Sequence, residues 1–222
     1  MKRLVALLVP VCLVWSQPSV AFDEDELAAL LTTNECFGCD LRGADLAGAD
    51  LAEAYLTYTN LTGAILVGAD LTDSFVAFGI LPEADFSDAN LTNANLGDAD
   101  LRGAVFVGAD LTSAKVSGAT MRDANLAGAI LIGANLTNAN MRFANLAGAE
   151  LAGADFTGAT MASTNLTNTN LAGAILSRAG LQGADLTDAD LTGADLDGAN
   201  LTDVIFCRTV MGDGTTNNEG CP

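Results

Sequence analysis

The sequence has no histidine, and only 9 of its 222 residues are lysine or arginine, against 28 aspartates and glutamates. Without histidine, and with no serine or cysteine beside a base, the usual nucleophile and base pairs of enzymes are missing. We therefore expect no catalytic residues, no cofactor and no metal centre. The shortage of basic residues excludes nucleic-acid binding through phosphate neutralisation. We interpret the acidic excess as a solubilising surface on a chain that is 50% hydrophobic.

A long apolar run is missing as well. The main apolar stretch, Leu4 to Trp15, follows Lys2 and Arg3 and is shorter than the roughly 20 residues that a membrane-spanning helix needs. Small residues at Ser19 to Ala21 complete the pattern of a secretory signal peptide over residues 1–21. The alternative, a single membrane anchor, has the length of the stretch against it. Loss of Lys2 and Arg3 gives a mature net charge of 7 − 28 = −21.

What the sequence does have is a period of five. From Leu41 to Phe206 a large apolar residue, here called the centre, recurs at every fifth position without an insertion or deletion. Leucine fills 25 of these 34 positions, and alanine stands two residues before the centre in 27 of them. Such a long register in one frame indicates a repeat architecture.

Two apolar residues separated by one polar residue point to the same side of a short extended segment. The remaining positions suit a turn, because the second residue after the centre is glycine in 16 of 34 repeats. A helix does not fit, since a step of five residues rotates the centre by about 140° and spreads leucine around the axis. One unit cannot bury its leucine alone, so stacked coils must form the core.

The run resembles the pentapeptide-repeat family, as "DLRGADLAGADLAEAYL" and "FSDANLTNANLGDADLRGA" show. The resemblance covers Asp40 to about Arg208. It implies an all-β fold: a right-handed, quadrilateral parallel β-helix with four repeats per coil, about eight coils, and a rod about 40 Å long at ~4.8 Å per coil. The expected domains are a signal peptide at 1–21, an N-terminal cap at 22–39, the β-helix at 40–208 and a capping tail at 209–222.

With four repeats per coil, residues 20 apart stack into columns. An arginine column contains four of the seven mature basic residues, and a carboxylate column is interrupted by Ile130 and Asn170. Tyr55 and Tyr58 should lie beside Phe75 and Phe78, either as a contact surface for a partner or a second copy, or packed on each other or under the N-terminal segment. The arginine column is Arg42, Arg102, Arg122 and Arg142; the carboxylate column is Asp50, Asp70, Asn90, Asp110, Glu150 and Asp190.

Both ends of an open solenoid need covers. Asp23 to Thr33 predicts a short amphipathic helix with Leu27, Leu30 and Leu31 on one side. The mature chain holds Cys36, Cys39, Cys207 and Cys221. A rod of the implied length separates the two ends by far more than the ~7 Å that a disulfide spans, so the expected pairs are Cys36 with Cys39 and Cys207 with Cys221. A redox pair or half of a zinc site is the less favoured interpretation of Cys36 and Cys39.

The function expected from these features is that of a non-enzymatic exported scaffold or protein-binding module in a periplasm or thylakoid lumen, with no bound nucleic acid and no membrane span in the mature form. Three alternatives stay open. One is a DNA mimic that binds gyrase, as some acidic members of the family do. The others are a weak calcium-binding array on the carboxylate column and an ice-binding array on a column of Thr72, Thr92 and Thr112.

Overall fold

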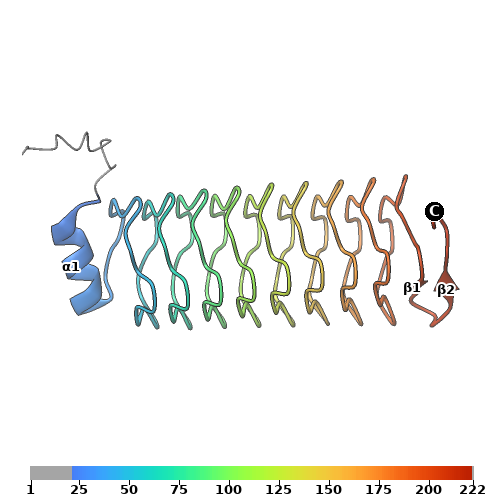
Figure 1. The fold of residues 1–222 in the computed structure, drawn as a ribbon, viewed down its shortest axis with the longest axis horizontal. Coiled ribbons are helices and arrows are strands. Elements are labelled where there is room, and N and C mark those ends of the chain that lie inside the picture. Colours follow the sequence, from blue (N-terminus) through green and yellow to red (C-terminus); the bar gives the residue numbers. More distant parts are fainter. Residues whose placement is uncertain (1–21, 222) are drawn as a thin grey trace, which may run out of the picture.

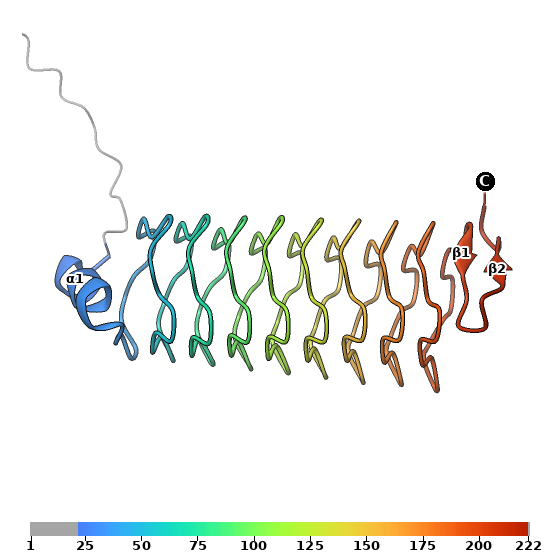
Figure 2. The ribbon, with the colours of Figure 1, turned by 90° about the horizontal axis from the view of Figure 1, so that it is seen from below.

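The computed structural model describes residues 22–221, and the predicted signal peptide lies outside them. The described chain is a straight rod of stacked coils, with helix α1 at one end and the strands β1 and β2 at the other (Figures 1 and 2). Helix α1 spans Glu24–Thr33, β1 spans Thr209–Val210 and β2 spans Thr216–Asn217. Within residues 22–221, no helix has the length and apolar character that a membrane crossing requires.

Parallel bridges join each coil to the next at a spacing of twenty residues, from Glu35 with Tyr55 to Asp190 with Val210. At each rung the centre donates its N–H to the carbonyl 19 residues ahead, as Leu126 does to Asn145 at 2.7 Å. Few residues form regular strands, because each extended segment contributes a single bridged residue before the chain turns again. Four five-residue repeats thus separate stacked positions, which is the spacing that the columns require.

The corners explain which residues the repeat selects. The second residue after each centre has positive φ, as at Gly48 with φ +64°, and glycine adopts this conformation without a steric penalty. The residue before the centre is often Asp or Asn, and its side-chain oxygen accepts the N–H of the residue after the centre. Asp45 does this for Ala47 at 3.1 Å. This local hydrogen bond stabilises the turn. The recurrent Asp and Asn residues therefore have a structural role in the fold.

Centres and the alanines two residues before them fill the interior. Every centre from Leu41 to Leu191 is buried, and Phe86 stacks on Phe106 inside the rod with ring centroids 4.8 Å apart. This continuous ladder gives the rod one core along its whole length, because each coil buries the apolar residues of its neighbours.

Helix α1 is bound tightly to the first coil. Asp23 caps its N-terminus by accepting the N–H of Asp25, and the Glu26 carboxylate accepts the N–H of Asp40 at 2.6 Å. Leu30 is completely buried. The expectation for Leu31 is wrong: it is 55% exposed, because the 100° step from one helical residue to the next turns it away from the coil once Leu30 faces inward.

Two disulfides lie at the two ends. Cys36 and Cys39 are joined with a Cα–Cα distance of 5.4 Å, and Cys207 and Cys221 with 4.7 Å. These are the pairs that the sequence predicts. β1 and β2 form an antiparallel pair in which Thr209 faces Asn217 and Val210 faces Thr216, so the tail folds back over the last coil.

Candidate functional site

The aromatic patch, defined as Tyr55, Tyr58, Phe75 and Phe78, lies on two successive coils near the N-terminal end. The bridge between Tyr55 and Phe75 places the first pair side by side, and their rings stack with centroids 4.9 Å apart. Tyr58 and Phe78 stack in the same way at 5.2 Å. The four side chains pack on each other, yet each remains between 40% and 54% exposed. Such stacked, half-exposed rings present a rigid apolar surface to solvent.

Phe37 extends the patch, and sequence reasoning missed it. Its ring meets Tyr58 edge to face, with centroids 5.4 Å apart, and is 75% exposed. Phe37 lies between the two cysteines of the first disulfide, in the coil that stacks on Tyr55 and Tyr58, because the bridges begin with Glu35 and Tyr55. Its place beside Gly38, which is 20 residues before Tyr58, is the sequence signal that could have found it.

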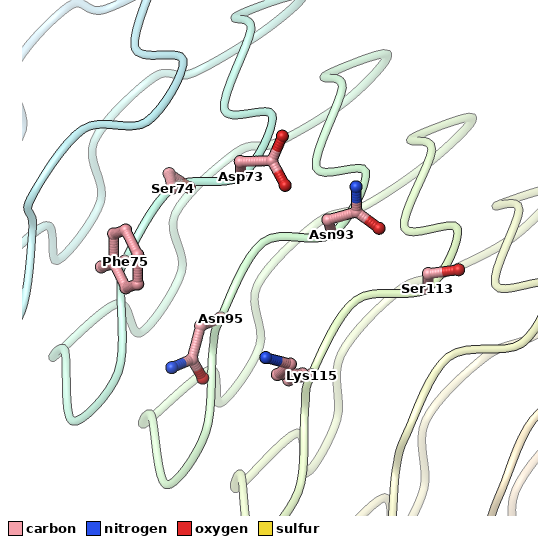
Figure 3. A pocket seen from close by; sticks show the side chains of 7 residues that line it. All are labelled: Asp73, Ser74, Phe75, Asn93, Asn95, Ser113 and Lys115. Carbon is pink, nitrogen blue, oxygen red and sulfur yellow. The ribbon is translucent and has the colours of Figure 1, made fainter.

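A shallow hollow of about 340 Å³ adjoins the patch at Phe75 (Figure 3). Figure 3 shows two rows of side chains across three coils, one of Asp73, Asn93 and Ser113 and one of Phe75, Asn95 and Lys115. In the second row Lys115 extends toward Asn95. Lys115 is the one lysine among residues 22–221, and the sequence analysis did not single it out. The Ser74 hydroxyl is buried beside the hollow without a hydrogen-bond partner. The lining residues are Asp73, Ser74, Phe75, Asn93, Asn95, Ser113 and Lys115.

The arginine column is mostly neutralised by neighbouring acids. Arg42 and Arg102 each clamp the aspartate two residues before them, with N–O distances of 2.6 Å at Asp40 and Asp100. Hydrogen bonding to the Arg102 guanidinium lowers the pKa of the Asp100 carboxyl below its ordinary value. These arginines therefore hold local surface pairs and do not form an open cationic stripe.

Arg122 and Arg142, the other two members of the arginine column, have different surroundings. Arg122 pairs with Asp123 at 3.1 Å and lies 5.3 Å from the ring centre of Phe143. Among residues 22–221, Arg142 makes no ion pair of the same kind. The column thus exists as a line in the structure, but its cations serve separate neighbours.

The carboxylate column is also present, because bridges join Asp50 to Asp70 and so on to Asp190. Within the described part of the chain, no three acidic or cysteine side chains lie close enough together to hold a metal ion. In the threonine column two hydroxyls are engaged: Thr72 donates to Asp70 at 2.6 Å, and Thr92 donates to Asn90 at 2.7 Å. At Thr112 the backbone N–H donates to Asp110 at 2.9 Å. Of the surfaces that the sequence predicts, the aromatic patch is the one that exposes large apolar side chains.

Comparison with known proteins points to one family. The model for pentapeptide repeats matches residues 35–73 and, in overlapping segments, residues 84–203. HetL of the cyanobacterium Nostoc sp. strain PCC 7120, described as a pentapeptide repeat protein involved in heterocyst differentiation regulation, is 34% identical over 82% of this chain and 87% of HetL, with a TM-score of 0.47. No curated protein sequence matches the chain.

Two further solved structures are similar over different lengths. A pentapeptide repeat protein of the Arabidopsis thaliana thylakoid lumen is 28% identical, over 40% of this chain and 66% of that protein, with a TM-score of 0.25. QnrB1, a plasmid-mediated fluoroquinolone resistance protein, is 21% identical over 74% of this chain and 84% of QnrB1, with a TM-score of 0.41.

Proposed function

Because the chain belongs to the pentapeptide-repeat family, we propose that it is a non-enzymatic exported scaffold whose aromatic patch binds a partner protein. The observation that carries the proposal is the pair of ring stacks, Tyr55 on Phe75 and Tyr58 on Phe78, held half-exposed on adjacent coils. Aromatic side chains that are already ordered lose little conformational entropy on binding, and they dominate the energy of protein interfaces.

The backbone at two of these positions strengthens the proposal. Tyr58 and Phe78 have φ of +61° and +58°, a conformation that costs a residue with a side chain about 1 kcal/mol or more. The equivalent corner is Gly38 one coil before Tyr58 and Asp98 one coil after Phe78, both with positive φ. The turn itself does not require an aromatic side chain at this corner, because Gly38 and Asp98 adopt the same conformation. A role in binding accounts for them.

We also propose the handedness, the number of coils and the domain boundaries of the rod. We infer a right-handed quadrilateral β-helix of about eight coils over residues 40–208, an N-terminal cap at 22–39 that includes α1, and a capping tail at 209–222. The anchoring of Glu26 to Asp40 supports the cap. The return of β2 over β1 supports the tail.

Affinity capture with a defined variant tests the patch. Tyr55→Asn and Phe75→Asn copy the residues that the same column carries at Asn95 and Asn135, and Tyr58→Gly with Phe78→Gly relieves the corners. This fourfold variant should fold and lose the partner that the wild type retains from an exported fraction. A control in which exposed residues elsewhere are changed, Ile132→Thr with Phe143→Gly, should keep it. Equal capture of the partner by all three proteins would refute the proposal that the aromatic patch binds it.

Solution mass separates a second copy from another partner. If the patch joins two copies, the wild type is a dimer and the fourfold variant a monomer. An oligomer that the fourfold substitution leaves unchanged removes the second copy as the partner.

Export rests on residues 1–21, with the periplasm or thylakoid lumen as destination. The processed N-terminus should be Phe22, as N-terminal sequencing of the cellular protein would show. The second candidate, a DNA mimic that binds gyrase, is favoured by the net charge alone. Recovery of the unprocessed protein from the cytoplasm would contradict export, and a gyrase supercoiling assay would then test the mimic directly.

A further inference from the structure

The C-terminal end of the rod is covered over only half of its circumference. The tail returns from β1 to β2 above residues 206–211, at the far end of Figure 2 from α1. Leu196 and Leu201, the centres of the other two faces of the last coil, are only partly buried, whereas every centre from Leu41 to Leu191 is buried. Apolar surface that coils bury everywhere else is therefore accessible here.

The backbone on these two faces is open as well. In the preceding coil Leu191 donates its N–H to Val210 at 2.7 Å, and in the last coil Phe206 donates to Glu219 at 2.7 Å. Among the described residues, four amides of the last coil have no protein acceptor, and two carbonyls in positions that earlier coils use have no donor. The amides are Leu196, Gly198, Leu201 and Asp203; the carbonyls are Ala194 and Ala199.

These free amides and carbonyls occupy the positions that form hydrogen bonds between successive coils in the rest of the rod. Earlier in the rod the carbonyl two residues before a centre accepts an N–H from 21 residues ahead, as Ala174 accepts from Asp195 at 2.9 Å. The open edge therefore offers an acceptor and two donors on each of two neighbouring faces. An exposed sheet edge of this kind pairs with an added strand.

Charge selects the occupant. Residues 190–205 contain four aspartates and no lysine or arginine, and Asp195, Asp197 and Asp203 are exposed at the rim of the open edge. The Ser177 hydroxyl donates to Asp195 at 2.6 Å and lowers the pKa of its carboxyl, which favours the charged form of Asp195. A second copy would bring the same charges to the contact and be repelled, whereas a basic segment would be attracted.

We propose that the open final coil binds an extended, basic peptide segment of another protein, which adds as a strand along Leu196 and Leu201. The backbone of the segment pairs with the open amides and carbonyls of the final coil. Its small and large apolar side chains pack over Leu196 and Leu201. Its lysine or arginine side chains face the aspartates. This site lies at the opposite end of the rod from the aromatic patch and does not depend on it.

A defined peptide tests the proposal. The probe is fluorescently labelled Ala-Lys-Leu-Lys-Gly-Ala-Lys-Leu-Lys-Gly-Ala, and the control is a peptide of the same composition without the small-x-large spacing. Binding of the probe to the full-length protein should slow hydrogen exchange in fragments spanning residues 192–205 by about tenfold. A matched mid-rod fragment, residues 112–125, should not change. Equal protection by both peptides, or protection spread along the rod, overturns the proposal.

Variants separate the charge from the edge. Asp195→Asn with Asp197→Asn should weaken the probe by about tenfold at low salt, and Asp45→Asn with Asp50→Asn, which removes the same charge at the other end, should leave it unchanged. Leu201→Ala should weaken binding, because it removes apolar contact and leaves the charge of the edge unchanged. An equal loss in both charge variants would show attraction to the whole surface and overturn the site. Protection that appears with rising protein concentration and no peptide would assign the edge to a second copy and also overturn it.

Discussion

Polar residues that replace the buried alanine of the repeat fall into two classes, those whose hydroxyl forms a hydrogen bond and those whose hydroxyl does not. Thr164 replaces the usual alanine two residues before a centre, and its buried hydroxyl donates to the Met141 carbonyl at 3.0 Å. Ser74 occupies the same position in its repeat and is also buried, but its hydroxyl has no partner. A buried polar group without a hydrogen bond costs stability.

Replacing the two residues by alanine should therefore have opposite effects. Ser74→Ala should raise the free energy of unfolding by about 1 kcal/mol, because it removes an unsatisfied hydroxyl. Thr164→Ala should lower it by about 1 kcal/mol, because it removes a satisfied hydrogen bond. Urea unfolding of both variants beside the wild type measures the difference. A loss of stability in Ser74→Ala equal to that in Thr164→Ala would mean that the Ser74 hydroxyl is bonded in solution.

At the scale of elements, the two disulfides close loops of very different length. Cys207 and Cys221 are 14 residues apart and hold the tail over the last coil, whereas Cys36 and Cys39 are 3 residues apart. Restricting a longer loop removes more conformational freedom from the unfolded chain. The tail disulfide should thus contribute more to stability than the N-terminal one.

Removal of the tail disulfide should release one end of the rod. Cys207→Ser with Cys221→Ser should lower the free energy of unfolding by about 3 kcal/mol and speed hydrogen exchange in the last coil first, because Phe206 then loses its bond to Glu219. Cys36→Ser with Cys39→Ser is the matched control and should cost less. Faster exchange that begins at the aromatic patch would contradict this role of the tail.

The sequence predicts the regular elements well, because one residue type at one spacing decides them. The buried centres follow from the five-residue register, whereas the twenty-residue stacking and the disulfide pairs follow once the family resemblance implies four repeats per coil. The orientation of Leu31, the contact of Phe37 with Tyr58 and the approach of Lys115 to Asn95 do not. These features depend on the packing of the chain ends and on side-chain conformations, which the five-residue pattern does not specify. The open edge at Leu196 was equally hidden, since it depends on where the tail stops covering the coil.

At the scale of the whole molecule, the rod presents a different surface near each end. The aromatic patch lies on coils next to α1, and the open edge lies beside β1 and β2 (Figures 1 and 2). The anionic surface between them repels like-charged copies and keeps an apolar chain in solution. With both proposed sites, one rod would hold two partners of different chemistry apart.

Cysteine cross-linking tests the twenty-residue stacking on which every one of these surfaces depends. Asn125 and Asn145 are bridged on neighbouring coils, and their side chains meet at 3.0 Å, so Asn125→Cys with Asn145→Cys should form a disulfide, since adjacent strands lie ~4.8 Å apart. Asn125→Cys with Asn140→Cys, on a different face, should not. Peptide mapping without reduction reads the result. A link in the second pair and none in the first would contradict the stacking, and with it the aromatic patch and the open edge.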